Sequence, residues 1–455
     1  MNKIQKIGAS VLTLALLGSL LAGCMSGTKE ADKGAGTAPA PAPLKDEALT
    51  DTPVMTDPIN LTFYKFYVGL TDKEFDQYFV QPLKKKYPNV TLTLVNSGLT
   101  GPLSPENILL AGVEPDLIFT SNYSFSIFKN LKLNQNLNSY LEKTKFDLNR
   151  FDPAIVESLK KYNDDGIYAI PFSNNLAALF YNKDIFDRFG VEYPKEQSTW
   201  DEILALHKKL VKNDGGVQYR GIVPPVAKQF GDQMALSYAD NSTKKATLET
   251  DQWKKAISLY KQFYEIPGMI EGDKLPTDNK TFFEEQSTAM YTNWADTALA
   301  NLTKLNDNGT PMNWDMTTYP SFSDAKGIGR RVDFHLMMMS ATSKHKDLVF
   351  DIMRYMTNET IQLDMTKNAR MTALNNEEIK KQYAQAFKIM EGKNLAAALK
   401  FKSAGVKPSD FDAPISGVVN KAGYDVANNK TDVNTALRTA QEEANKIIAE
   451  EAAKK

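Results

Sequence analysis

The stretch from residue 166 to residue 210 constrains the fold of this chain more than any other. Two apolar runs, 167–172 and 176–181, are separated by a polar break at 173–175. Two helices are expected after the second run, and the later one should begin after Thr199, which opens a Thr-x-x-Glu capping box. Two strands joined by a polar break indicate a chain crossing between two lobes. A length of 455 residues agrees, because one hydrophobic core rarely serves so long a chain.

The N-terminus has the layout of a secretory signal. Lys3 and Lys6 precede an apolar run over residues 7–21, and Leu-Ala-Gly-Cys follows, ending at Cys24. This ending resembles the bacterial lipobox, whose cysteine is lipidated. A transmembrane helix is the alternative, but spanning a bilayer takes about 20 apolar residues. We therefore expect a signal peptide over 1–23 and a lipid anchor at Cys24. Residues 24–56, rich in Ala, Pro and Gly, should form a disordered tether.

The next segment predicts an α/β fold. Apolar residues alternate over 59–66, a helical pattern follows to residue 86, and a second strand is expected over 90–95. This order implies parallel strands with a right-handed crossover. A buried strand is expected over 115–119. In open α/β sheets ligands bind beyond the carboxyl ends of the strands. Residues 64–67 and 120–124 occupy two such ends.

Further along the chain, the spacing of apolar and turn-forming residues predicts several helices, strands and turns. The segments expected to be helical are 106–111, 376–400 and the C-terminal stripe from 433 to 448. Residues 327–331 read as a turn, and 332–339 as a strand. A strand is also expected at 289–291, with Trp294 just past its end.

The sequence contains no recognisable catalytic or metal-binding motif. Its three histidines are isolated, and neither a GxSxG elbow nor a GxxxxGK[ST] phosphate loop is present. We therefore expect no catalytic residues, no metal and no cofactor. A formal charge of -1 gives no basic stripe for nucleic acid.

Aromatic, amide and carboxylate side chains cluster at the predicted strand ends. Flat rings stack on the apolar faces of sugar rings, and amides or carboxylates bind hydroxyl groups. Trp294 is the strongest candidate, because polar residues flank it. The predicted ligand contacts are Tyr64, Phe66, Asn122, Tyr123, Asn174, Asn175, Trp294, Asp296 and Asp333.

Five short motifs, in order, resemble the extracellular solute-binding proteins of ABC importers, in the branch that includes maltodextrin-binding proteins. The resemblance runs from about residue 57 to the C-terminus. The motifs are PDLI at 115–118, GIYAIP at 166–171, YNKDIF at 181–186, TWDE at 199–202 and AMYTNW at 289–294.

The resemblance implies a two-lobe periplasmic-binding-protein-like fold of type II. Each lobe would be a mostly parallel sheet flanked by helices, with the ligand cleft at the hinge. The N-terminal lobe would comprise 57–173 and about 321–375, and the C-terminal lobe 174–320 and about 376–455. The 173–175 break would be both hinge and ligand-facing wall. The lobes would close around the solute and then dock on a membrane permease.

The resemblance also implies a function. The chain would be a monomeric, lipid-anchored protein on the outer face of a Gram-positive membrane, and it would not be an enzyme. Trp294 matches the family's sugar-stacking tryptophan, whereas Asn175 stands where maltodextrin binders have an acid. Thr120 and Tyr123 also depart from the pattern, replacing a tryptophan and an aspartate. These departures favour an oligosaccharide other than a long maltodextrin.

Two alternatives stay open at this point. The same fold could bind a peptide, a polyamine or a modified amino acid. A cell-surface enzyme acting on polysaccharide would need two carboxyl groups at a defined separation, which the sequence does not reveal.

Overall fold

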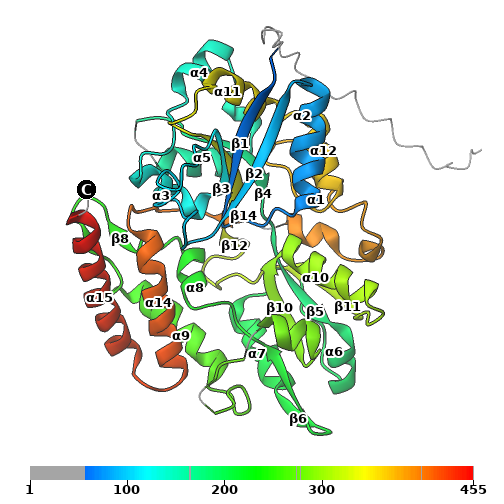
Figure 1. The fold of residues 1–455 in the computed structure, drawn as a ribbon. Helices are drawn as coiled ribbons and strands as arrows, with labels where there is room; N and C mark the ends of the chain where they lie inside the picture. Colours follow the sequence, from blue (N-terminus) through cyan, green and yellow to red (C-terminus); the bar gives the residue numbers. More distant parts are fainter. Residues whose placement is uncertain (1–56, 163–164, 273, 277, 401, 454–455) are drawn as a thin grey trace, which may run out of the picture. The chain divides into compact units, whose positions relative to one another are not determined.

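The computed structural model describes residues 57–453, except positions 163–164, 273, 277 and 401. The predicted signal peptide, Cys24 and the tether lie outside the described residues. Two five-stranded sheets organise the described part of the chain, together with two-stranded ribbons that include β12–β14 and β8–β9 (Figure 1).

The first sheet has the strand order β2-β1-β3-β13-β4. Its strands are β1 (Ile59–Phe66), β2 (Val90–Ser97), β3 (Leu117–Ser121), β4 (Ile170–Asn174) and β13 (Phe334–Met339). The pairs β1–β2 and β1–β3 are parallel, which confirms the β-α-β unit expected at the start of the chain. Strand β13 runs antiparallel to both of its neighbours.

The second sheet has the order β11-β5-β10-β7-β6. Its strands are β5 (Ala177–Asn182), β6 (Lys212–Asp214), β7 (Val217–Ile222), β10 (Thr288–Trp294) and β11 (Trp314–Thr318). Only β10–β7 is parallel among its pairs in the described residues. In the first sheet four of the five strands run in the same direction and β13 alone is reversed, so that sheet is mostly parallel as expected. The second sheet is mixed rather than mostly parallel. The physical reason is that strands arriving from the other lobe, such as β13 and β5, insert against the direction of their neighbours.

The predicted crossing between lobes is confirmed. Strand β4 belongs to the first sheet and β5, two residues later, belongs to the second. The chain returns through β12 (Ile328–Arg331), whose partner is β14 (Lys402–Ala404), and then enters β13. The segment 327–331 is thus largely a strand, not the turn expected from its glycines.

Each sheet is flanked by helices that bury an apolar face. Around the first sheet these are the continuous helical stretch α1 (Asp72–Phe75), η1 (Asp76–Val80) and α2 (Gln81–Lys86), with α3 (Phe125–Asn130), α4 (Asn138–Thr144), α5 (Pro153–Tyr162), α11 (Lys346–Tyr355) and α12 (Glu359–Lys367). Their buried side chains join those of the strands in one core, in which Phe63, Phe79, Phe119 and Phe172 lie within 4.7–5.7 Å ring to ring.

The second lobe has its own helices. They are α6 (Lys183–Phe189), α7 (Trp200–Leu210), α8 (Lys228–Gln233), α9 (Asp251–Tyr264), α10 (Ala295–Asp307), α14 (Asp412–Ala427) and α15 (Val433–Ala453). Helices α14 and α15 run side by side and pack on α9 (Figure 1). Two apolar clusters fill this lobe, one on each side of β5, because Leu179 belongs to one cluster and Phe180 to the other.

Helix α7 shows how local sequence fixes an element. The Thr199 hydroxyl accepts a hydrogen bond from the Glu202 amide, and the Glu202 carboxylate accepts one from the Thr199 amide at 2.7 Å, so the predicted capping box is present. The face predicted to be apolar is buried. One of its members, His207, accepts a hydrogen bond from the Ile222 amide at 3.0 Å and so ties α7 to β7.

Two helix predictions were wrong. Residues 106–111 form turns, and in 376–400 only α13 (Glu377–Lys380) is an α-helix, followed by turns and 3-10 segments. Alanine favours helix, but the second of these segments instead wraps along the second lobe, where Ala384 and Ala398 are buried. Among the described residues, no helix combines the length and the apolar character needed to cross a bilayer.

Candidate functional site

A cavity of about 200 Å³ lies where the end of β3 faces the second lobe, and we call it the interlobe cavity. Tyr67, Tyr123 and Tyr162 reach it from the first lobe, whereas Lys228 on α8 and Tyr238 come from the second. Four serines also line it. The wall therefore offers aromatic faces and hydroxyl groups, the two features that recognise a polar solute with ring faces.

The wall of this cavity is held by a chain of polar contacts. The guanidinium carbon of Arg331 lies 3.8 Å from the centre of the Tyr123 ring, and Arg331 Nη1 lies 3.4 Å from Asp232 Oδ1. The Tyr238 hydroxyl donates to the same oxygen at 2.8 Å. Burial raises the pKa of Tyr123 to about 12, so its hydroxyl stays protonated and can donate to a ligand.

Asn122 lines the interlobe cavity, but its amide is already engaged. Its Nδ2 donates to the Tyr162 hydroxyl at 3.1 Å and to the Val332 carbonyl at 3.2 Å, and its Oδ1 accepts from the Phe334 amide at 3.0 Å. These bonds clamp the end of β3 to the start of β13. Asn122 therefore shapes the site through the backbone that it holds, while its role as a ligand contact stays a prediction.

Tyr64 and Phe66, two of the predicted contacts, lie in the core of the first lobe. Both are fully buried, and the Tyr64 hydroxyl donates to the Leu103 carbonyl at 2.6 Å. The structure thus places both side chains in packing, and neither lines the interlobe cavity; their role as ligand contacts stays a prediction. The next residue, Tyr67, is 65% exposed and lines the interlobe cavity. The alternation of side chains along a strand could have shown that Tyr64 and Phe66 point to the opposite face from Tyr67. It does not show which face of the sheet the helices cover.

The crossing carries a buried polar cluster, which we call the hinge cluster. Asn175 Nδ2 donates to Asp333 Oδ2 at 2.8 Å and lies 3.1 Å from His335 Nε2. Arg370 Nη1 lies 2.8 Å from His335 Nδ1, and Arg370 also pairs with Glu74 on α1 at 2.8 Å. Thus the polar break after β4 is bonded to the strand that returns from the second lobe.

Two atoms at the hinge lack partners among the described residues. Asp333 Oδ1 and Asn174 Oδ1 are both buried without a hydrogen bond. Burial raises the pKa of the Asp333 carboxyl to about 6, although the bond from Asn175 and the nearby arginines oppose that rise. Such unpaired acceptors are costly to bury. Both are acceptors that no described residue uses.

Trp294 is the last residue of β10, and its ring is half-buried. The guanidinium carbon of Arg330 lies 3.7 Å from the ring centre. One face of the indole is therefore covered by a cation. Asp296, two residues on, accepts from the Thr297 amide at 2.6 Å in the first turn of α10.

Asp296 also lines a second space, of about 470 Å³, between α10 and the first lobe. Its other wall contains Lys73, Glu74 and Arg370. The predicted contacts Trp294 and Asp296 are thus near neighbours in sequence and fold, whereas Tyr123 lines the interlobe cavity. The structure brings Asn175 and Asp333 together. The nine predicted contacts as a set, however, do not lie in a single site.

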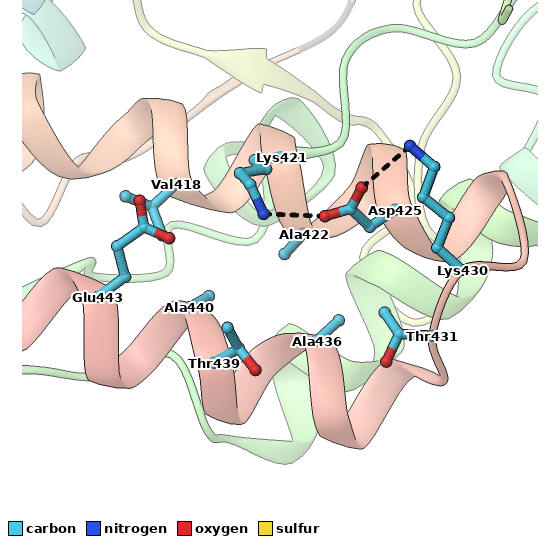
Figure 2. Close-up of a pocket in the computed structure, with 10 residues that line it drawn as sticks. All are labelled: Val418, Lys421, Ala422, Asp425, Lys430, Thr431, Ala436, Thr439, Ala440 and Glu443. Atoms are coloured by element: carbon cyan, nitrogen blue, oxygen red, sulfur yellow. Dashed lines mark hydrogen bonds and ion pairs between the residues drawn. The ribbon is translucent and has the colours of Figure 1, made fainter. Parts of the chain in front are cut away.

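A third hollow lies between α14 and α15, and Figure 2 shows its walls. It measures about 250 Å³, and all its lining residues come from the second lobe. Lys421 and Lys430 both reach the carboxylate of Asp425, at 3.0 and 3.6 Å. No aromatic ring lines it, and its wall lacks any residue of the crossing. This groove does not have the features expected of the solute site.

A metal centre is not found in the part of the chain that the structure describes, where no group of three or more His, Cys, Asp or Glu could hold an ion. His207 and His335 are bound to protein groups instead.

The sequence was also compared with known protein families and curated proteins. The profile of the family described as "Bacterial extracellular solute-binding protein" matches residues 69–363. A curated relative, an uncharacterized ABC transporter extracellular-binding protein from Pyrococcus horikoshii, is 24% identical over 213 residues. That match covers 45% of this chain and 44% of the relative, so the chain spans less than half the length of this relative.

Solved structures share the fold. An ABC substrate-binding protein from Listeria monocytogenes, in complex with cycloalternan, superposes with a TM-score of 0.69 at 20% identity, covering 86% of this chain and 100% of that one. The sugar-binding protein MalE from the phytopathogen Xanthomonas citri gives a TM-score of 0.66 at 16% identity, covering 86% and 98%. At these identities the likeness establishes the two-lobe α/β fold.

Proposed function

Because the chain belongs to the bacterial extracellular solute-binding proteins, we propose that it captures a carbohydrate, in particular an oligosaccharide, between its two lobes. It would then deliver the sugar to the permease of an ABC transporter. Binding would shift an open–closed equilibrium of the lobes about the β4–β5 crossing. The protein acts as a carrier of solute and not as an enzyme.

The interlobe cavity is the observation that carries this proposal. Tyrosine rings and serine hydroxyls from both lobes meet there, beyond the carboxyl end of β3. A ligand that touches both Tyr123 and Tyr238 would hold the lobes together. One structural neighbour is an ABC substrate-binding protein in complex with cycloalternan and another is named a sugar-binding protein, and both support a saccharide as the solute.

We further propose that Cys24 carries a lipid that holds the protein on the outer face of the membrane of a Gram-positive bacterium, with residues 25–56 as tether. In this arrangement a monomer would reach its permease by diffusion along the membrane. The signal-like residues before Cys24 support the proposal.

The direct test is a panel of di- to hexasaccharides titrated against the purified protein. Melting shifts would find the binders, since a ligand present at 100 times its Kd stabilises the folded state by about 2.7 kcal/mol. Calorimetry would then give the affinity of each. Tyr123→Ala should weaken binding, whereas Tyr424→Ala, a change on the exposed surface of α14, should not.

Other outcomes would redirect the proposal. Peptides or polyamines that bind while no saccharide does would overturn the choice of solute class. Lys228 and Arg331 in the cavity wall argue against a polyamine, because like charges repel. Turnover of a polysaccharide by the purified protein would overturn the carrier role.

A further inference from the structure

Two adjacent arginines of β12, Arg330 and Arg331, are buried at the junction of the lobes, each only 8% exposed. Each lies over an aromatic ring, Trp294 and Tyr123 respectively, at 3.7 and 3.8 Å from the ring centre. A guanidinium cannot lose its charge at neutral pH. Both positive charges are therefore permanent features of this junction.

These cations have few partners of opposite charge. Within the described residues, Arg330 makes no hydrogen bond or ion pair, and its Nε is buried without a partner. Arg331 reaches Asp232 only at 3.4 Å, and its Nε is likewise unpaired. Stacking on a ring returns less free energy than burying an unpaired charge costs. The arginines retain hydrogen-bonding capacity that the protein does not use.

Lys228 adds a third positive charge at the same place. It lines the interlobe cavity beside Arg331, and its ammonium lies 5.8 Å from the centre of the Tyr123 ring. No ion pair to Lys228 is present among the described residues, and burial lowers its pKa. Lys228 and Arg331 therefore both lie near the ring of the same tyrosine in the cavity wall.

Nearby carboxylates could neutralise the positive charge of these cations. Asp412 is the acidic residue in the described wall of the cavity, and its Oδ1 accepts from the Ser409 hydroxyl at 2.5 Å. Asp232 lies behind Arg331 and accepts from Tyr238 as well. Asp333 is bonded to Asn175 in the hinge cluster. The wall itself thus presents two cations against one carboxylate, and hydroxyl donors surround them.

We propose that the interlobe cavity receives an acidic group of the solute, a carboxylate or a phosphate, between Lys228 and Arg331. The natural solute is then an acidic saccharide. This inference rests on the proposed function and adds the charge of the sugar to it. Charge-assisted hydrogen bonds from the two cations and from the Tyr123 hydroxyl hold the anionic oxygens. The stacked ring fixes the plane of the Arg331 guanidinium for that contact.

The test compares each acidic sugar with a neutral partner of the same size. Trigalacturonate is set against its methyl ester, and glucose 6-phosphate against glucose, so that the two pairs distinguish a carboxylate from a phosphate. Calorimetry should show at least tenfold tighter binding of the acid in one pair. The preference should fall as salt rises, because salt screens charge.

Variants tie the effect to the cavity. Lys228→Met should abolish most of the preference for the acid, and Lys228→Arg should keep it. Lys421→Met removes a charge of the same sign from the α14–α15 groove and should change nothing. Because Lys228 is only half-buried and makes no ion pair with a described residue, these variants should fold, and their melting temperatures will check that.

The outcomes separate the two proposals. If the methyl ester and glucose bind as tightly as the acids, or if Lys228→Met keeps the acid preference, the inference is wrong and carbohydrate capture stands. If inorganic phosphate or a peptide binds while no saccharide of either charge does, carbohydrate capture fails and the inference fails with it.

Discussion

The guanidinium carbon of Arg330 lies 3.7 Å from the centre of the Trp294 ring, closer than any other cation–ring contact among the described residues. This contact joins β12 to the end of β10. It also covers one face of the indole, so a solute can stack only on the other. The contact holds the Trp294 ring in place without any ligand.

Replacing Trp294 should weaken solute binding without unfolding the protein. Tryptophan is enriched among the few binding residues whose truncation costs about 2 kcal/mol or more, which is more than tenfold in Kd. Trp294→Ala should therefore raise the Kd for the best saccharide at least tenfold in calorimetry. Trp294→Phe keeps an aromatic face and should lose less. If Trp294→Ala and the unaltered protein bind the saccharide equally well, Trp294 is not a ligand contact.

Asp333 should make the protein less stable as pH rises from about 4 to 6. Its pKa is raised by burial from 3.8 to about 6, so in this window the folded protein binds more protons than the unfolded chain. The free energy of unfolding then falls with rising pH, by about 1–3 kcal/mol in total, and stays lower above pH 6. Asp333→Asn should remove that loss.

Urea unfolding at pH 4, 5.5 and 7.5 measures this effect. The variant should gain stability over the unaltered protein at pH 7.5 but not at pH 4. His207 works in the opposite direction, because burial lowers its pKa to about 4 and stability falls as pH falls from 6.5. That contribution is common to both proteins and cancels in their difference. A difference that does not change with pH contradicts the assignment.

Features with local causes could be predicted from the sequence. The β4–β5 crossing follows from two apolar runs around a polar break, and the start of α7 follows from the spacing of Thr199 and Glu202. Strands β1 and β2 were predicted for the same reason, since alternation and a helix between them lie within 40 residues. These elements need no distant partner to be recognised.

The features that could not be predicted from the sequence depend on contacts between distant segments. Residues 328–331 form a strand only because β14, more than 70 residues later, pairs with them. Arg330 and Arg331 were therefore missed as site residues. Likewise Tyr64 is buried because helices cover its side of the first sheet, which its own strand does not reveal. The signal that could have found the arginines is two adjacent cations two residues before Asp333, in the segment that leads into β13.

A contact between the lobes should influence affinity without touching solute. Lys129 on α3 pairs with Asp410, just before α14, at 2.9 Å, and both are about one-third exposed. If solute binding draws the lobes together, losing this pair should raise the Kd about two- to fivefold, as expected for a partly exposed ion pair. Lys129→Met tests this by calorimetry.

Lys143→Met is the matched control for that variant. Lys143 pairs with Asp347 at 3.1 Å, but both belong to the first lobe, on α4 and α11. Its removal should leave the Kd unchanged. The same increase for both variants would show that the effect is one of net charge.

Cys24 should determine where the protein resides in the cell. Cys24→Ser removes the thiol that would carry the lipid, so we expect no incorporation of labelled palmitate and loss of the protein from the membrane fraction. Ser26→Ala, two residues beyond the cysteine, should leave both unchanged. Retention of Cys24→Ser in the membrane fraction with its signal region removed would contradict lipid anchoring.

Two glycines of α14 should respond to alanine in opposite directions. A Cβ at Gly423 would overlap the Ala227 Cβ, where α14 packs against the start of α8. Gly423→Ala should therefore force the helices apart and lower the free energy of unfolding by about 1–3 kcal/mol. Gly417, on the exposed side of the same helix, has nothing within 4 Å of such a Cβ. Gly417→Ala should stabilise the helix by up to about 1 kcal/mol. Urea unfolding of both variants measures the difference, and destabilisation of similar size at both sites would show that α14 does not pack as closely on α8 as described.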